Sequence, residues 1–362
     1  MCSTRAKSPA SPINCSKNRC AAMAEALLTR EAAEAATVAR HQLAENATVI
    51  ADLVERLRIK RPAFVATCAR GSSDHAATYG KYLIERALGL PVASLGPSLA
   101  SVYGGELDLS RAVFIAASQS GRSPDALLLT EAAKRAGALV VGFVNDEASP
   151  LARLVDVLVP LRAGSERSVA ATKSFLATCL AFLHLTAEWA EDEALSEALA
   201  QAPEALDAAG RSDWTPALLS WREASSLYVI GRGLSLGIAQ EIALKFKETC
   251  RIHAEAFSAA EVLHGPLALV GPGFPALALD PGDEGSESVR AAATAFSGLG
   301  ADLRYAGSAA AGESLALPPN LPAALLPLAQ VRAFYGALAA LAQSRGLDPD
   351  RPPHLSKVTR TV

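Results

Sequence analysis

Two short stretches far apart in the chain decide the fold: Phe64-Val65-Ala66-Thr67-Cys68-Ala69-Arg70-Gly71 and Leu227-Tyr228-Val229-Ile230-Gly231-Arg232-Gly233. Each is a short apolar run that ends in a glycine turn and leads into a helical pattern. Such a run is typical of a strand that is buried on both faces of a parallel sheet. Because the same strand–turn–helix unit occurs twice, we expect two duplicated α/β domains.

Strands and helices alternate around both stretches. We expect further strands over 90–94, 112–117, 138–144, 156–160, 274–279 and 301–305, and helices over 74–88, 97–103, 124–136 and 286–299. This alternation predicts βαβ units with parallel sheets. The predicted fold class is therefore α/β, with two tandem doubly wound domains of three-layer, flavodoxin-like architecture.

The chain divides at changes in composition. Residues 1–22 hold four basic and no acidic residues and no hydrophobic stretch, so they are no secretory signal. We expect either a disordered extension there or a misassigned start, with translation beginning at Met23. The remaining boundaries that we predict are N-terminal helices over 23–60 with a break near Asn46, a first domain over 61–190, a helical linker over 191–220, a second domain over 221–345 and a C-terminal tail over 346–362.

Composition excludes several classes of function. Half of the 362 residues are apolar, 20% are charged and the net charge is −3, so no strong cationic field attracts nucleic acid or an anionic membrane. No apolar run reaches the length of a membrane span. The six cysteines form no CxxC pair, and no cluster has metal-ligand spacing. We expect a cytoplasmic protein that binds no nucleic acid, membrane, metal or cofactor.

The loop Ser118-Gln119-Ser120-Gly121-Arg122-Ser123 follows a predicted inner strand and precedes a helix. Ligands of open α/β sheets bind at this edge, and the start of a helix offers backbone N–H groups to an anion. Gly71-Ser72-Ser73 holds the same place after the first strand. On residue types alone, a phosphate cradle and an ordinary helix cap are both open for the serine loop. The equivalent loop of the second half, 280–285, is rich in carboxylates and would repel phosphate, so we expect the anion site in the first domain.

Two further features are candidates for proton transfer. Glu241, Lys245 and Glu248 share one face of a predicted helix, a pattern that is typical of a solvated salt-bridge ladder but also fits a carboxylate tuned by an ammonium. His264 stands at a helix end before Gly265-Pro266, where it is either structural or an acid–base group that titrates near neutral pH.

Several motifs occur together in one order. They are Ser118-Gln119-Ser120-Gly121, Ala170-Ala171-Thr172-Lys173, the block 243–256, the block 261–269 and the tail Leu355-Ser356-Lys357. In this combination the chain, from about Glu31 to its end, resembles the sugar isomerase (SIS) domain family. It is most similar to the isomerase half of glucosamine-6-phosphate synthase and to stand-alone sugar-phosphate deaminases.

The resemblance implies a role for individual residues. Glu248 matches the base that moves a proton between C1 and C2, and Lys245 the cation beside it. Lys357 matches a lysine that can form a Schiff base with a keto-sugar, and His264 a residue that assists ring opening in the neighbouring subunit's site, which implies a homodimer. The sugar phosphate would be bound by Gly71, Ser72, Ser73, Ser118, Gln119, Ser120, Ser123, Val169, Ala171 and Ser356. Ala171 departs from the serine that relatives often have.

The resemblance also implies an activity. Residues 1–30 do not resemble the synthase's glutaminase domain, so we expect deamination: glucosamine 6-phosphate and water give fructose 6-phosphate and ammonia. The alternatives are a synthase-type isomerase that lacks the glutaminase, a galactosamine-6-phosphate deaminase, a deglycase for fructosamine phosphates, and, outside the enzymes, a regulator that senses a sugar phosphate. Because Glu248, His264 and Lys357 are all present, we favour an enzyme.

Overall fold

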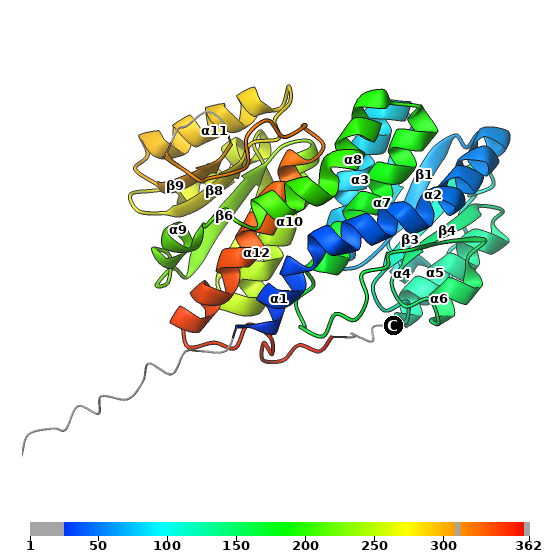
Figure 1. Ribbon diagram of the computed structural model, residues 1–362, viewed down its shortest axis with the longest axis horizontal. Helices are drawn as coiled ribbons and strands as arrows, with labels where there is room; N and C mark the ends of the chain where they lie inside the picture. Colours follow the sequence, from blue (N-terminus) through cyan, green and yellow to red (C-terminus); the bar gives the residue numbers. More distant parts are fainter. Residues whose placement is uncertain (1–24, 308–311, 358–362) are drawn as a thin grey trace, which may run out of the picture.

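The computed structural model describes residues 25–307 and 312–357, so the predicted extension 1–22 lies outside the described residues. Within these ranges the chain folds into two five-stranded parallel sheets that lie at opposite ends of the molecule, with a layer of long helices between them (Figure 1). The prediction of two tandem, doubly wound α/β domains is confirmed.

The first sheet has the strand order β2-β1-β3-β4-β5. Its strands are β1 (Phe64–Cys68), β2 (Val92–Ser94), β3 (Ala112–Ser118), β4 (Leu139–Val144) and β5 (Val157–Pro160). The outer face is covered by α4 (Ser98–Ser101), α5 (Pro124–Arg135) and α6 (Pro150–Leu154), which enclose a separate apolar cluster. The expected elements agree with these bounds to within a few residues, apart from α6, which was not expected.

The second sheet repeats the first. Read from its other edge, its order β7-β6-β8-β9-β10 has the same topology, with β6, β8 and β9 in the places of β1, β3 and β4. The strands are β6 (Ser226–Gly231), β7 (His253–Ser258), β8 (Pro275–Leu279), β9 (Asp302–Ala306) and β10 (Glu313–Ser314), with α11 (Ser286–Gly298) and the 3₁₀ helices η1 (Glu261–His264) and η2 (Pro266–Leu269) beside them. Gly71 and Gly233, which precede the first helix of each domain, have φ angles of 52° and 54°.

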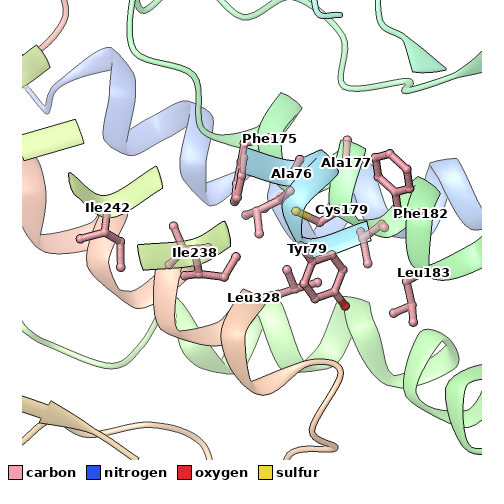
Figure 2. Packing of buried hydrophobic residues seen from close by; sticks show 14 of the residues in the cluster. Ala76, Tyr79, Phe175, Ala177, Cys179, Phe182, Leu183, Ile238, Ile242 and Leu328 are labelled. Carbon is pink, nitrogen blue, oxygen red and sulfur yellow. The ribbon is translucent and has the colours of Figure 1, made fainter. Parts of the chain in front are cut away.

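The central layer is shared by both domains. It contains α1 (Leu27–Ala33), α2 (Ala35–Lys60), α3 (Ser72–Leu88), α7 (Lys173–Ala190), α8 (Glu193–Ala209), α9 (Thr215–Leu219), α10 (Leu234–Cys250) and α12 (Leu326–Ser344). One continuous apolar cluster joins these helices to the inner faces of the two sheets. Figure 2 shows Tyr79 of α3, Phe182 of α7 and Ile238 of α10 meeting in this interior. The two domains therefore share one core.

Helices α3 and α10 pack closely across the domain boundary. A Cβ atom on Gly237 of α10 would lie 2.4 Å from the backbone oxygen of His75 on α3, so only glycine allows this approach. Each of the two helices follows the first strand of its own domain. Their contact brings the start of α3 against the middle of α10, where the candidate site lies.

The predicted break near Asn46 is wrong, because α2 runs without interruption through this residue. Asn46 is buried, donates to the backbone oxygen of Pro160 at 2.7 Å and accepts from Nε of Arg162 at 2.9 Å. These tertiary contacts offset the low helix propensity of asparagine. The actual break between the N-terminal helices lies at Glu34.

None of the described helices is both long and apolar enough to cross a membrane. The cysteines at 68, 179 and 250 are buried and unpaired, and burial raises the pKa of the Cys68 thiol to about 12. They are small core residues, whereas the three cysteines of residues 1–22 lie outside the described residues.

Candidate active site

A cleft of about 320 Å³ opens at the carboxyl ends of β1 and β3. From β1 the chain crosses to β2 at one edge of the sheet, and from β3 it crosses to β4 on the other side. Neighbouring strands whose connections leave in opposite directions form the switch point at which α/β sheets bind ligands. The topology thus places the cleft between the two loops that the sequence had indicated.

The cleft gathers residues from four separate segments. Its lining consists of Arg70, Gly71, Ser72, Ser73, Ser118, Gln119, Ser120, Ser123, Val169, Ala171 and Lys357. Every predicted substrate-binding residue except Ser356 is in this set, and so is Lys357, the predicted Schiff-base lysine. Ser356 is exposed on the tail beside Lys357.

The serine loop between β3 and α5 forms a tight turn with a hydrogen bond of its own. Ser118 Oγ accepts from the backbone N–H of Gly121 at 2.9 Å, and Gly121 has a φ of 60°. A Cβ there would lie 2.2 Å from Ser149 Oγ, so the loop needs glycine at this position. Ser123 is the N-cap residue of α5 and Pro124 follows it at the start of the helix, as the cap interpretation expects. Its hydroxyl makes no capping hydrogen bond to the helix N–H groups and donates instead to Asp125 Oδ1 at 2.6 Å.

Asp125 also binds the arginine that follows β1. Nε and Nη2 of Arg70 reach its Oδ2 at 3.2 and 2.5 Å. Burial acts to raise the pKa of Asp125, but the hydrogen bonds from Ser123 and Arg70 outweigh it and hold the pKa below its ordinary value. Asp125 thus stays ionised at the first turn of α5, where the helix dipole also favours a negative charge.

Lys357 enters the cleft from the C-terminal tail and pairs with Glu166, which has no exposed side-chain surface. The Glu166 carboxylate accepts from Lys357 Nζ at 2.9 Å, from the backbone N–H of Thr172 at 2.9 Å and from the hydroxyl of Ser174 at 2.5 Å. Burial acts to raise the pKa of Glu166, yet the ammonium and these donors lower it. Glu166 is therefore a buried anion that holds the lysine.

The tail is anchored before it reaches Lys357. The carboxylate of Asp350 accepts from the first backbone N–H groups of α1, at Leu27 and Leu28, both at 2.7 Å. Glu31 on the same helix accepts from the backbone N–H groups of Arg167 and Ser168. Helix α1 thus ties the tail to the loop that carries Glu166.

The predicted charge ladder on α10 is buried, so its interpretation as a solvated surface feature is wrong. Lys245 and Glu241 have no exposed side-chain surface. Lys245 Nζ donates to Glu248 Oε2 at 2.7 Å, to Ser72 Oγ at 3.0 Å and to Glu241 Oε1 at 3.2 Å. Burial works to lower the pKa of Lys245, but the two carboxylates raise it. With three acceptors for its three N–H bonds, Lys245 is a fixed cation.

Glu241 is in turn held by two other helices. His75 Nδ1 of α3 lies 3.1 Å from its Oε2, and the hydroxyl of Tyr335 on α12 donates to its Oε1 at 3.0 Å. Burial acts to raise the pKa of Glu241, whereas Lys245 and His75 lower it. A buried ionic network therefore connects α3, α10 and α12 at the boundary of the two domains.

Glu248 faces a second hollow of about 350 Å³. Leu244, Lys247, Glu248, Arg251 and the tail residues Pro353, His354 and Leu355 line it. The tail thus contributes to both hollows, with 353–355 in one and Lys357 in the other. Lys245, which contacts both Glu248 and Ser72, links them through the interior.

His264 lies elsewhere. It is exposed at the end of η1 and lines neither hollow. Within one chain the structure does not bring it to Glu248 or Lys357, so its contribution to a neighbouring subunit's site stays a prediction. Among the residues that the structure describes, no group of His, Cys, Asp and Glu side chains could hold a metal ion.

The second switch point, between β6 and β8, is occupied by the chain's own groups. Asp280 is buried and accepts from the backbone N–H of Gly282 and from the hydroxyl of Tyr305, both at 2.9 Å. Arg86 of α3 pairs with Asp283 and Glu284 in the same loop. The acidic loop thus binds a cation of the protein itself.

Sequence reasoning missed Arg70 and its partner Asp125 at the cleft, Glu166, which holds Lys357, and His75 and Tyr335, which contact Glu241 in the interior. Glu166 follows a glycine-containing loop and precedes two hydroxyl residues at a helix start, a pattern that surface loops share. Arg70 directly precedes Gly71-Ser72-Ser73, the turn that we predicted to bind the sugar phosphate. Its position at the end of β1 was the signal that could have identified it as a residue of the cleft.

Comparison with known proteins gives a consistent result. The model of the SIS domain family matches residues 64–187 and 221–303, one segment in each domain, which confirms the resemblance seen in the motifs. A glutamine–fructose-6-phosphate aminotransferase (isomerizing) from Aeropyrum pernix is 36% identical over 309 residues, covering 79% of this chain and 49% of that protein. The chain thus spans about half the length of this relative.

Solved structures of similar proteins agree with the match to the SIS domain family. A protein from Silicibacter pomeroyi DSS-3, described as a candidate phosphosugar isomerase, is 44% identical with a TM-score of 0.86, covering 90% of this chain and 100% of that one. The C-terminal domain of glucosamine-fructose-6-phosphate aminotransferase from Francisella tularensis has a TM-score of 0.80 at 23% identity, covering 91% and 99%, and shows the same fold. The relatives are named as enzymes, which places the chain among the enzymes of this family.

Proposed function

The chain belongs to the SIS domain family, and on that premise we propose that it deaminates an amino-sugar phosphate: glucosamine 6-phosphate and water give fructose 6-phosphate and ammonia. Support comes from the Aeropyrum relative, whose name contains fructose 6-phosphate, and from the 44% identical protein described as a candidate phosphosugar isomerase. A homodimer in the cytoplasm is part of this proposal.

One observation carries the proposal. The serine loop, the glycine turn after β1 and Lys357 line a single cleft, and Ser72 in that lining contacts the Lys245 ammonium that also binds Glu248. An anion cradle, an amine and a carboxylate with a fixed counter-cation are the groups that isomerisation of a phosphorylated amino sugar requires.

In the proposed mechanism the phosphate lies against Ser118, Gln119 and Ser120 at the start of α5, where backbone N–H groups and hydroxyls donate hydrogen bonds to its oxygens. The sugar extends past Ser73, Val169 and Ala171. His264 of a neighbouring subunit opens the ring by moving a proton between the ring oxygen and the C1 hydroxyl.

Glu248 then removes the proton from C2 and returns it to C1. In the same shift the C1 oxygen gains a proton and becomes a hydroxyl while the C2 amine loses one, so the double bond moves from C1–O to C2–N and the product is an imine at C2. Lys245 stays protonated throughout and holds Glu248 in place by donating to its Oε2 at 2.7 Å. Water adds to C2 and ammonia leaves, giving the ketose. In the reverse direction the Lys357 amine can form a Schiff base with the ketose.

Ammonia release by the purified protein tests the reaction. We expect ammonia from glucosamine 6-phosphate, less from galactosamine 6-phosphate, and a loss of about 10²- to 10⁴-fold in kcat for Glu248→Gln, since the amide cannot take up a proton. Unchanged kcat in Glu248→Gln would exclude this carboxylate as the base.

Two alternatives give different results in the same assays. A synthase-type isomerase would form glucosamine 6-phosphate from fructose 6-phosphate and ammonium, with little deamination. A sensor of sugar phosphates would bind fructose 6-phosphate without turnover in either direction. No ammonia from either amino sugar would therefore reject the deaminase.

A further inference from the structure

Arg70 is the cleft residue that neither the motifs nor the proposed mechanism uses. It follows β1, lines the cleft, and keeps 53% of its side chain exposed although it is paired with Asp125. Arg70 and Lys357 are the two charged side chains of the lining. Lys357 is held by the buried carboxylate of Glu166, on the side of the cleft formed by the tail. Arg70 is thus the cation on the side of the serine loop.

Asp125 connects Arg70 to that loop. One carboxylate oxygen accepts from Arg70 at 2.5 Å and the other from the hydroxyl of Ser123 at 2.6 Å. A carboxylate only accepts, so the single hydroxyl proton of Ser123 is directed to Asp125. In this arrangement Ser123 has no proton to donate to a phosphate oxygen.

Asp125 also creates an electrostatic problem for an anionic ligand. It lies in the first turn of α5, the same helix start that would accept a phosphate, and its side chain is only 2% exposed. An ionised carboxylate there repels a phosphate dianion unless a cation compensates it. Arg70 is bound to this carboxylate and supplies the compensation.

The arginine has donors to spare. Its guanidinium carries five N–H bonds in a planar fork, and the two hydrogen bonds to Asp125 use two of them. Because the group is half exposed toward the cleft, the other N–H bonds can donate to a phosphate oxygen. Guanidinium–phosphate contacts are among the strongest hydrogen bonds in proteins.

We propose that Arg70 is a phosphate-binding residue, oriented by Asp125, and that this pair makes the cleft selective for phosphate monoesters over unphosphorylated sugars. This inference rests on the proposed function, because it assigns the group that recognises the substrate's phosphate in the same cleft. Ser123 acts here by positioning Asp125.

Calorimetric titration with fructose 6-phosphate, fructose and inorganic phosphate tests the assignment without turnover. We expect Arg70→Ala to weaken binding of fructose 6-phosphate and of inorganic phosphate by about 10- to 100-fold, and Arg70→Lys by less. In kinetics KM should rise while kcat changes little, because the contact is the same in ground and transition states. Arg70→Ala/Asp125→Asn should recover part of the loss, since the repelling charge is removed as well.

Arg40→Ala is the matched control. Arg40 is 51% exposed and pairs with Glu204 at 3.1 Å, between α2 and α8, and it does not line the cleft. Its removal deletes the same charge and should change each affinity by less than about twofold, because a distant exposed charge is screened. Thermal melts of all variants exclude unfolding as the cause.

The outcomes separate this inference from the proposed function. If Arg70→Ala and Arg70→Lys bind inorganic phosphate as tightly as the wild type, the role of Arg70 is overturned and the deaminase proposal stands. If the wild type binds inorganic phosphate but not fructose 6-phosphate, the proposed product, and with it the proposed function, is overturned, whereas the affinities for inorganic phosphate still test the role of Arg70. A wild type that binds neither overturns both.

Discussion

The ammonium of Lys357 lies 2.9 Å from the carboxylate of Glu166, although 191 residues separate them in the chain. The same carboxylate accepts from Thr172 and Ser174 at the start of α7. One buried side chain therefore fixes the end of the tail, the loop before α7 and the start of that helix. The position of the tail lysine in the cleft depends on this carboxylate.

Glu166→Gln should destabilise the protein by about 1–3 kcal/mol, because the amide replaces an ionised acceptor and leaves Lys357 without its counter-charge. We also expect a lower kcat, since the tail is no longer held at the cleft. Urea unfolding followed by circular dichroism measures the stability. Glu204→Gln removes an exposed ion pair and should cost less than about 1 kcal/mol; equal effects of the two substitutions would contradict a structural role for Glu166.

The difference in unfolding free energy between the wild type and Glu166→Gln should depend on pH, and the direction of that dependence follows from the pKa of Glu166. The pKa of Glu166 is lower in the folded protein than the ordinary glutamate value of 4.5, so its ionised form stabilises the fold. The contribution is complete above pH 4.5 and is lost as pH falls below this value through the lowered pKa. The gap in unfolding free energy between wild type and Glu166→Gln should therefore be constant near pH 7 and narrow in acid. A gap that widens in acid would show the opposite pKa shift.

Tyr335→Phe tests the buried network around Glu241. Its hydroxyl donates to an ionised carboxylate at 3.0 Å, whereas the equally buried hydroxyl of Tyr79 donates to the neutral backbone oxygen of Ala324 at 2.7 Å. Hydrogen bonds to charged groups contribute more, so we expect a loss of about 1.5–3 kcal/mol for Tyr335→Phe and about 0.5–1.5 kcal/mol for Tyr79→Phe. Chemical denaturation of both variants measures these losses. A larger loss for Tyr79→Phe than for Tyr335→Phe would indicate that Glu241 is protonated.

Gly237→Ala tests the close crossing of α3 and α10. The new methyl group would lie 2.4 Å from the backbone oxygen of His75, so the helices must move apart at a cost of about 1–3 kcal/mol. The contact between Lys245 and Ser72 crosses the same interface, so kcat should fall as well. Gly336→Ala on α12 is the control: nothing lies within 4 Å of the added Cβ, and this variant should be neutral or more stable.

The sequence predicts the fold well where one local rule decides it. Apolar runs that end in glycine turns gave β1 and β6, and their repetition gave the duplication. Strand β7 was missed because His253-Ala254-Glu255-Ala256 alternates polar and small residues, as expected for the edge strand that it is. The break expected at Asn46 failed because its side chain finds partners near β5, which local propensity does not show.

The site was predictable only in part. The serine loop follows from strand order, since the carboxyl ends of β1 and β3 meet wherever the topology is doubly wound. Glu166 and Asp125 were not predictable in this way, because their importance lies in contacts with Lys357 and Arg70 that arise only when the chain is folded. Buried ion pairs between distant segments leave no period or spacing in a sequence.

The last prediction concerns the chemistry of Lys357. If its amine forms a Schiff base with fructose 6-phosphate, borohydride should reduce the imine to a stable secondary amine, and mass spectrometry of a digest should place the adduct on Lys357. Lys357→Ala should show no adduct. Lys247→Ala, which removes an exposed amine from the hollow beside Glu248, should be labelled as the wild type is. An adduct that persists in Lys357→Ala would exclude this lysine as the amine, and an adduct absent from all variants would leave water as the nucleophile at C2.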